Sequence, residues 1–185
     1  MARRVCSFWV GDLLLSPFRK LLENPDTIFG PLVRPGMTVL EPGCGMGFFT
    51  LPLAHMVGPR GQVVAVDLQP KMLSVLRRRA EKAGLLDRID LRLAESANLG
   101  LKDLTGKVDL VAALHVVHEV SNQSVFFAEL REILRPQGKL LIVEPRSYVS
   151  RMEFEETVVA AEKAGFRAEV SFRLVRGRSA LLGRM

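Results

Sequence analysis

The sequence predicts an α/β fold in which parallel strands are connected by crossover helices. Short apolar runs alternate with longer amphipathic segments, which is the pattern of such a sheet. The apolar runs are nearly continuous, as expected for parallel strands that are buried on both faces. The chain has 185 residues, of which 48% are hydrophobic and 25% charged, an ordinary composition for one globular domain.

Strands and helices are expected to alternate along the middle of the chain. The expected strands are Thr38–Glu41, Gln62–Asp67, Ile89–Leu93, Val108–Leu114 and Lys139–Glu144. The expected helices are Phe48–Met56, Pro70–Ala83, Gln123–Leu134 and Arg151–Ala164, with a short helix or loop at Leu99–Leu104. Proline in a first turn and glycine after a last turn support these boundaries.

Both ends of the chain depart from this alternation. Near the C-terminus, Arg167–Leu174 and Ser179–Leu182 are strand-like and flank a turn at 176–178, which predicts an antiparallel hairpin. Near the N-terminus, Asp12–Glu23 is an expected amphipathic helix that ends at Asn24-Pro25. We expect a single domain over 1–185, with an N-terminal helical cap at 1–35 and a core at 36–185.

Composition excludes several classes of protein. No apolar run approaches the roughly 18–20 residues of a membrane span, and Asp12 and Pro17 interrupt the N-terminal apolar stretch, so we expect a cytoplasmic protein that is not integral to a membrane. Two cysteines and three histidines favour neither a disulfide framework nor a metal site. The net charge of +6 permits an anionic partner without requiring one.

The glycine-rich segment after the first strand carries the strongest functional signal. The chain reads Val39-Leu40-Glu41-Pro42-Gly43-Cys44-Gly45-Met46-Gly47-Phe48-Phe49, a strand that runs into a turn and opens a helix. Glycines at such a turn let a ligand approach the backbone closely. Phe48 stands where the dinucleotide fingerprint has its third glycine, and this bulky ring disfavours a pyrophosphate site. Glu41 suits a cationic ligand, and a purely structural turn is the alternative.

A second signal is the acidic residue that ends the second strand. Asp67 follows the glycine turn by about 20 residues, and a carboxylate there can accept both hydroxyls of a ribose. A helix cap is the alternative role. If Asp67 binds a ribose, Leu68 and Met72 would supply an apolar surface for the adenine ring. Cys44 is expected to pack in the turn, and Arg77-Arg78-Arg79 to form a solvated helix face.

Taken together, these segments resemble the motifs of class I S-adenosylmethionine-dependent methyltransferases. The segments that carry the resemblance, in order, are the glycine turn, Asp67, Ala94-Glu95-Ser96, Val108–Leu114 and Leu134-Arg135-Pro136-Gln137-Gly138-Lys139-Leu140. The chain is most similar to the small-molecule branch that includes ubiquinone/menaquinone C-methyltransferase-like enzymes, over about residues 34–185. The resemblance implies a Rossmann-like three-layer α/β sandwich. Its seven-stranded, mostly parallel sheet would have the order 3-2-1-4-5-7-6, with strand 7 antiparallel.

The resemblance also implies a binding site for the methyl donor, S-adenosylmethionine. Glu41 would approach the methionine amino group, Asp67 the ribose, Glu95 the adenine amino group, and Leu114 would line the donor. The full set of expected donor-binding residues is Glu41, Gly43, Gly45, Gly47, Asp67, Leu68, Glu95, Ser96 and Leu114.

Two histidines follow the fourth strand, where acceptors lie in this family. Methyl transfer from a sulfonium needs a base only when the acceptor must first lose a proton. His115 and His118, with Glu119 adjacent, are the candidate catalytic residues, and His115 is favoured as nearer the donor. The alternative is a histidine that caps or packs at a helix start.

The sequence therefore predicts an S-adenosylmethionine-dependent methyltransferase that acts on a small-molecule acceptor by in-line displacement. RNA or protein is the alternative acceptor, although Ala112-Ala113-Leu114-His115 lacks the Asn-Pro-Pro-Tyr-like tetrad of enzymes that methylate base amines. A nicotinamide-dependent oxidoreductase and a non-catalytic donor-binding module are the alternatives from other classes. The acceptor and the oligomeric state do not follow from the sequence.

Overall fold

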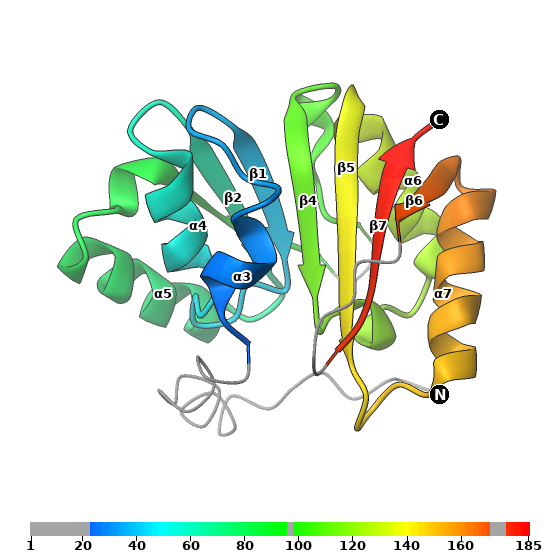
Figure 1. Ribbon diagram of the computed structural model, residues 1–185. Helices are drawn as coiled ribbons and strands as arrows, with labels where there is room; N and C mark the ends of the chain where they lie inside the picture. The colour runs from blue at the N-terminus through cyan, green and yellow to red at the C-terminus, as the bar shows by residue number, and fades with distance from the viewer. Residues whose placement is uncertain (1–22, 96–97, 171–176) are drawn as a thin grey trace. The chain divides into compact units, whose positions relative to one another are not determined.

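The strands form one mixed sheet with the expected order. The structure is a computed structural model that describes residues 23–95, 98–170 and 177–185. Among these residues, seven strands are arranged in the order β3-β2-β1-β4-β5-β7-β6 (Figure 1). β7 runs antiparallel to both of its neighbours, whereas β1, β2 and β3 pair in parallel, as do β4 and β5. The predicted fold class and strand order are confirmed.

The chain divides into two compact units, and the first extends to Ala94. Its described elements are α3 (Pro25–Phe29), β1 (Thr38–Pro42), α4 (Thr50–Val57), β2 (Gln62–Asp67), α5 (Pro70–Lys82), the 3₁₀ turn η2 (Leu86–Arg88) and β3 (Ile89–Leu93). β2 lies between β1 and β3. β1 and β2 are almost wholly buried, which explains their continuous apolar runs, whereas β3 is mostly half-buried.

The α5 helix shows how local sequence sets the boundaries in this unit. Pro70 occupies the first turn, and Gly84 follows the last with a left-handed φ of 65°. Met72, Leu76 and Ala80 recur every four residues and form the buried face of the helix. The predicted helix is confirmed, and Met72 belongs to this core face.

Asn24 and Pro25 begin a helix of the described chain. Asn24 caps the start of α3, where its side-chain oxygen accepts the Asp26 N–H at 2.9 Å. Asparagine satisfies free N–H groups at a helix start, and proline fits the first turn, so the same pair signals a beginning. The expected helix at Asp12–Glu23 lies almost entirely outside the described residues, and the cap at 1–35 stays a prediction.

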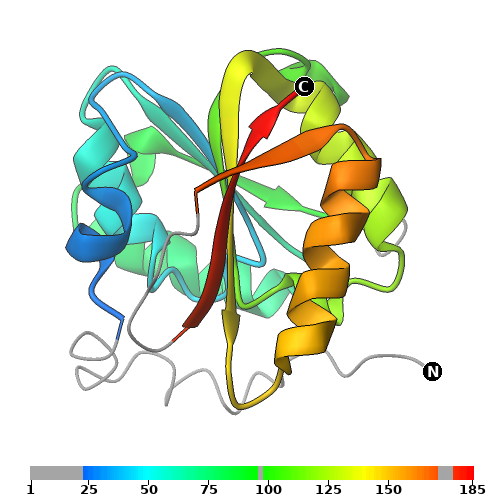
Figure 2. The ribbon, with the colours of Figure 1, turned by 45° about the vertical axis from the view of Figure 1, so that its right-hand side comes forward.

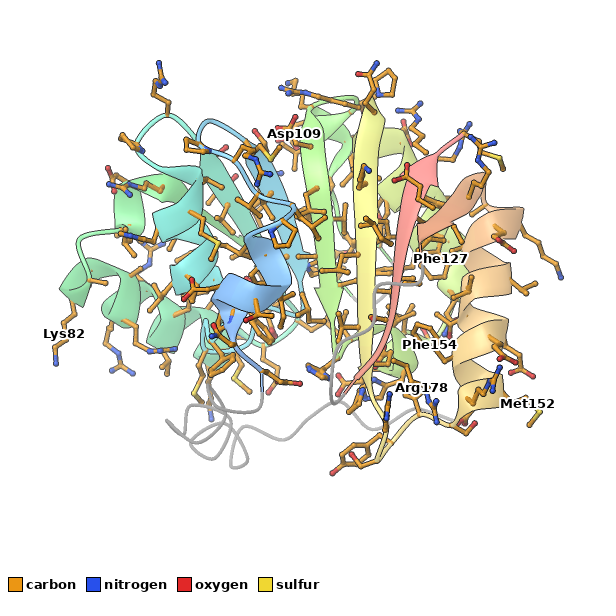
Figure 3. The ribbon with its side chains drawn as sticks, viewed as in Figure 1. Lys82, Asp109, Phe127, Met152, Phe154 and Arg178 are labelled. Carbon is orange, nitrogen blue, oxygen red and sulfur yellow. The ribbon has the colours of Figure 1, made fainter. Side chains whose placement is uncertain are left out.

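The second unit begins at Glu95. Its described elements are η3 (Lys102–Leu104), β4 (Val108–Leu114), η4 (Val117–Glu119), α6 (Gln123–Ile133), β5 (Leu134–Pro145), α7 (Arg151–Lys163), β6 (Phe166–Val170) and β7 (Gly177–Arg184). β7 runs between β5 and β6, and α7 lies beside β6 (Figure 2). Phe127 points from α6 into the interior of this unit (Figure 3), and its ring packs at 69° against that of Phe166.

β5 starts earlier than its hydrophobic pattern indicates. The strand was expected from Lys139, but it begins at Leu134, opposite Val108. The register then shifts, so that Leu110 faces Lys139 and the polar residues between form a bulge. Gly138 is required there, because a Cβ would lie 2.8 Å from Leu134 Cδ2 and 3.0 Å from the Val108 carbonyl oxygen.

The expected C-terminal hairpin is confirmed as an antiparallel β6–β7 pair. Gly177 and Arg178, which were expected in the turn, already belong to β7, where they face Pro145 and Glu144 of β5. The rest of the expected turn falls in 171–176, outside the described residues. Within the described ranges, no helix has the length and hydropathy that a membrane span requires.

We predict that the N-terminal cap of α7 stabilises the fold measurably. Ser150 accepts the Glu153 N–H at 3.2 Å, and Glu153 accepts the Ser150 N–H at 2.8 Å, which is a complete capping box. Ser150→Ala should lower the free energy of unfolding by about 1 kcal/mol in urea titrations. Ser150→Asp retains a capping oxygen and should stay close to wild type, and equal losses for both variants would contradict the role of the cap.

Candidate active site

The glycine turn after β1 is tied to the end of β2. The backbone N–H groups of Gly43 and Cys44 both donate to the Val66 carbonyl oxygen, at 2.8 and 3.1 Å. Gly43, Gly45 and Gly47 all have left-handed φ angles, of 70°, 53° and 83°. Since side-chain-bearing residues rarely adopt these angles, the alternation of glycines is what allows the chain to turn here.

Gly45 and Gly47 are glycines for different reasons. A Cβ on Gly47 would lie 2.3 Å from Cδ1 of the buried Leu76 of α5, so this position must be small for packing. A Cβ on Gly45 would meet nothing within 4 Å. The backbone at Gly45 is therefore open, which is what close approach of a ligand requires.

Asp67 joins this turn to the end of β2. Its Oδ2 accepts the Gly45 N–H and its Oδ1 accepts the Gln69 N–H, both at 2.8 Å. Burial raises the pKa of Asp67 above its ordinary value of 3.8, against the lowering effect of the backbone hydrogen bonds from Gln69, Gly45 and Leu68. The carboxylate is thus rigidly held, and each oxygen still has a lone pair for a ligand hydroxyl.

Glu41 in β1 and Cys44 within the turn are both buried. Thr50 of α4 donates to Glu41 Oε2 at 2.6 Å, which ties the end of β1 to the following helix. Burial first, and the nearby Glu41 and Asp67 carboxylates next, raise the pKa of the Cys44 thiol well above its ordinary value. Cys44 therefore stays protonated, as its expected packing role requires, because the thiolate is the nucleophilic form.

Arg79 has a role that the sequence interpretation missed. The triplet 77–79 was expected to be solvated, and Arg77 and Arg78 are exposed. Arg79 instead donates to the Met46 carbonyl oxygen, and its partial burial lowers the pKa of its guanidinium. It thereby links α5 to the glycine turn. The sequence held one signal for this contact. Arg79 lies three residues after Leu76, so both side chains share the helix face that meets the turn.

Exposed apolar side chains flank Asp67, but not both of those expected. Leu68 is 44% exposed, whereas Met72 is buried in the core and is not available as an adenine surface. Leu93 of β3 is 58% exposed and lies directly opposite Asp67 in the parallel register. Leu93 is therefore a candidate apolar surface for an adenine ring. The sequence interpretation missed it, because a leucine at the end of an apolar strand is usually assigned to the core.

The segment after β3 holds the remaining residues expected at the adenine. Ala94 donates its N–H to the Asp67 carbonyl oxygen at 3.0 Å, and the exposed Glu95 follows it and forms a bridge with Asn98. Ser96 lies outside the described residues. In the second unit, Glu129 accepts the N–H groups of Leu99 and Leu101, at 2.8 and 3.2 Å, and so fixes the later part of this segment.

Leu114 and His115 end β4 in the second unit. Leu114 is buried, and the His115 N–H donates to the Val143 carbonyl oxygen of β5 at 2.7 Å. His115 has a φ of 57°, and it is the one residue other than glycine with positive φ among those described. A strained backbone of this kind is held by its surroundings and occurs often at functional sites.

His118 contacts a buried carboxylate of β5. Its Nδ1 lies 2.6 Å from Oε2 of Glu144, which is almost completely buried near the end of β5. Glu144 was expected only as a strand end, and its pairing with His118 was not predicted. The available signal was an acidic residue that closes an apolar run, the same pattern that marks Asp67.

Comparison with known proteins places the chain in a family. Residues 34–173 match the family described as "Methyltransferase domain". The chain belongs to the methyltransferase domain family. This membership confirms the family that the motifs indicated. Within the described ranges, no group of three or more histidine, cysteine, aspartate or glutamate side chains could hold a metal ion.

Individual curated relatives resemble different shares of the chain. An uncharacterized protein of transposon TN4556 from Streptomyces fradiae is 35% identical over 60% of the chain and 31% of its own length. The ubiquinone/menaquinone biosynthesis C-methyltransferase UbiE of Shewanella frigidimarina is 31% identical over 64% of the chain and 46% of its own length. The chain thus spans less than half of these curated relatives.

A solved structure matches nearly the whole chain. The SAM dependent methyltransferase from Aquifex aeolicus superposes with a TM-score of 0.82 at 26% identity, and the match covers 97% of both chains. The methyltransferase fold of this chain therefore extends beyond the part that aligns with UbiE.

We predict that alanine at Gly47 destabilises the protein more than alanine at Gly45. Each substitution imposes the left-handed strain of about 1–2 kcal/mol, and Gly47→Ala adds a clash of about 1–3 kcal/mol with Leu76. Urea unfolding followed by circular dichroism measures the difference. Gly84→Ala, where φ is 65° and the space is also open, is the control for strain alone. Equal losses for all three variants would contradict the packing role of Gly47.

Proposed function

We propose that this protein is an S-adenosylmethionine-dependent methyltransferase that acts on a small-molecule acceptor. The observation that carries the proposal is the link between Asp67 and Gly45. The Asp67 carboxylate accepts the Gly45 N–H, and the space that a Gly45 side chain would occupy is open. Such a carboxylate is suited to the two hydroxyls of a ribose, and the open backbone lets the rest of the donor lie against the turn.

The residues favour this donor over a dinucleotide. Phe48 replaces the glycine that a pyrophosphate site uses, and its ring packs edge-on against Phe49, with centroids 4.8 Å apart. Below the turn, the buried Glu41 places an acidic group where a diphosphate would be repelled. A sulfonium and an α-amino group are cationic, so the acidic surroundings of the turn favour them.

Each donor-binding residue has a proposed role. Asp67 would hold the ribose, Glu41 would act toward the methionine amino group, and Leu68 with Leu93 would cover the adenine ring. Glu95 and Ser96 would accept the adenine amino group, and Gly43, Gly45 and Gly47 would form the backbone wall of the site. Leu114 would line the donor, and His115 and His118 would act on the acceptor side.

The donor supplies the methyl group on a good leaving group, so the protein's main task is placement. Positioning the acceptor in line with the carbon–sulfur bond is by itself worth roughly 7–11 kcal/mol of the activation barrier to methyl transfer. The resemblance to UbiE, named a C-methyltransferase, supports a small-molecule acceptor. A cytoplasmic location is part of the same proposal.

We predict that Asp67→Asn weakens S-adenosylmethionine binding at least tenfold. Hydrogen bonds to a charged group contribute about 1.5–3 kcal/mol each, and every 1.4 kcal/mol is about a factor of ten in affinity. Isothermal titration calorimetry measures the loss, and circular dichroism checks the fold. Asp90→Asn, on the neighbouring strand, is the matched control and should bind as wild type does. Unchanged affinity in Asp67→Asn, or tight binding of NADH by wild type, would contradict the proposal.

We also predict that donor affinity falls in acid. Burial raises the pKa of Asp67 above 3.8, and ribose binding favours its ionised form. Affinity should therefore be constant above the pKa of Asp67 in the free protein and decrease as the pH falls through it. Calorimetry across the acidic range tests this, with Asp67→Asn as the variant that lacks this dependence. A wild-type affinity that rises in acid would contradict the role of the carboxylate.

A further inference from the structure

The glycine turn contains a closed β-turn. The Gly47 N–H donates to the Cys44 carbonyl oxygen at 3.0 Å, so Gly45 and Met46 are its two central residues. Gly45 has a φ of 53°, whereas Met46 does not have a positive φ. A positive φ at the first central residue alone is the mark of a type II′ turn, which favours glycine at that position.

Two charged side chains hold the centre of this β-turn. The Asp67 carboxylate accepts the Gly45 N–H at 2.8 Å, and the Arg79 guanidinium donates to the Met46 carbonyl oxygen. Asp67 reaches the turn from the end of β2, and Arg79 reaches it from α5. An anion therefore binds the N–H of one central residue and a cation binds the carbonyl of the next, and hydrogen bonds to charged groups are the stronger kind.

The Arg79 guanidinium is partly removed from water to make this contact. Arg79 is half-buried, whereas its neighbours Arg77 and Arg78 are exposed. Burial lowers the pKa of Arg79, although an arginine stays charged at neutral pH. A neutral carbonyl compensates for lost hydration less fully than a carboxylate would. The contact is therefore better explained by a need to fix the Met46 carbonyl than by a gain in overall stability.

Arg79 provides a contact that Asp67 cannot. A carboxylate has no proton to donate, so Asp67 can hold the Gly45 N–H but not the Met46 carbonyl. In the proposed function, Asp67 also accepts the ribose hydroxyls, so the same group serves both the turn and the ligand. The two side chains are therefore not interchangeable, and loss of Arg79 would leave the Met46 carbonyl without its charged donor.

We propose that Arg79 is a positioning residue for donor binding, which acts through the Met46 carbonyl to keep the glycine turn in its binding conformation. This inference rests on the proposed function, in which the turn is the backbone wall of the donor site. Glycines flank Met46 on both sides, and glycine adopts several backbone conformations at similar cost, so contacts from outside must select one of them. A wall that is already ordered loses less conformational freedom when the donor binds, which increases affinity.

Donor affinity in variants of Arg79 tests the proposal. Arg79→Met removes the guanidinium, and we expect about tenfold weaker binding of S-adenosylmethionine in calorimetry, since a hydrogen bond to a charged group is lost. Arg79→Lys retains a cation that can donate to one carbonyl oxygen, so its affinity should return to within about threefold of wild type. Arg78→Met, on the exposed side of the same helix, is the matched control and should bind as wild type does.

A second control separates positioning from stability. Ile89 is buried at the start of β3, four residues before the Leu93 that lies opposite Asp67. Ile89→Val removes a buried methyl group and should lower the free energy of unfolding in urea titrations. Its donor affinity should nevertheless equal that of wild type, because the folded protein retains the contact between Arg79 and Met46.

Hydrogen exchange tests the arrangement without the donor. The N–H groups of Gly45 and Gly47 are both bonded within the turn, so their exchange in the free protein, followed by NMR, reports how often the turn opens. Arg79→Met should exchange both groups about tenfold faster than wild type, because one of the contacts that keep the turn closed is lost. Arg78→Met should leave both rates unchanged.

The outcomes separate this inference from the proposed function. Failure of wild type to bind S-adenosylmethionine would overturn the proposed function, and the inference with it. If wild type binds, an unchanged affinity in Arg79→Met or an equal loss in Arg79→Lys would overturn the inference alone. So would a loss of affinity in Ile89→Val as large as that in Arg79→Met, or unchanged exchange in the turn of Arg79→Met.

Discussion

A buried carboxylate must have its oxygens hydrogen-bonded, and this constraint organises both units of the protein. Glu41, Asp67 and Glu144 each stand at or next to the end of a buried strand, and all three are buried. Water cannot satisfy such a group, so the protein must supply donors. The donors come from Thr50, from the backbone at Gly45 and Gln69, and from His118. Each carboxylate thereby fixes the segment that it contacts.

The two units satisfy this constraint with different donors. At the glycine turn, the groups bound to Asp67 are backbone N–H groups, which are rigid and do not titrate. That arrangement is suited to recognising a ligand without changing its protonation. At η4, Glu144 binds a backbone N–H and an imidazole together, which fixes the orientation of the His118 ring. The first arrangement supports donor binding in the proposed function, and the second attaches η4 to the end of β5.

Local strain accompanies both arrangements. Three glycines adopt left-handed angles in the turn, and His115 does so at the end of β4. Glycine bears this conformation at little cost, whereas histidine requires surrounding contacts to hold it, here the hydrogen bond from its N–H to Val143. Around the turn, Leu76 and Arg79 of α5 contact the same loop from the other side. The loop is thus held by packing, a charged side chain and the Asp67 carboxylate.

Local sequence patterns determined the strands, most helix boundaries, the glycine turn and Asp67, because apolar periodicity and glycine spacing depend on neighbouring residues. The predicted roles of the site residues stay predictions. Only the tertiary structure decided what depends on distant partners. Met72 is core and Leu93 is exposed because of the face each presents, and Arg79 meets a carbonyl that lies 33 residues away. Glu144 and His118 are 26 residues apart, and parallel pairing of β4 with β5 places them in contact. Such contacts follow from strand register and helix packing, which no local pattern specifies.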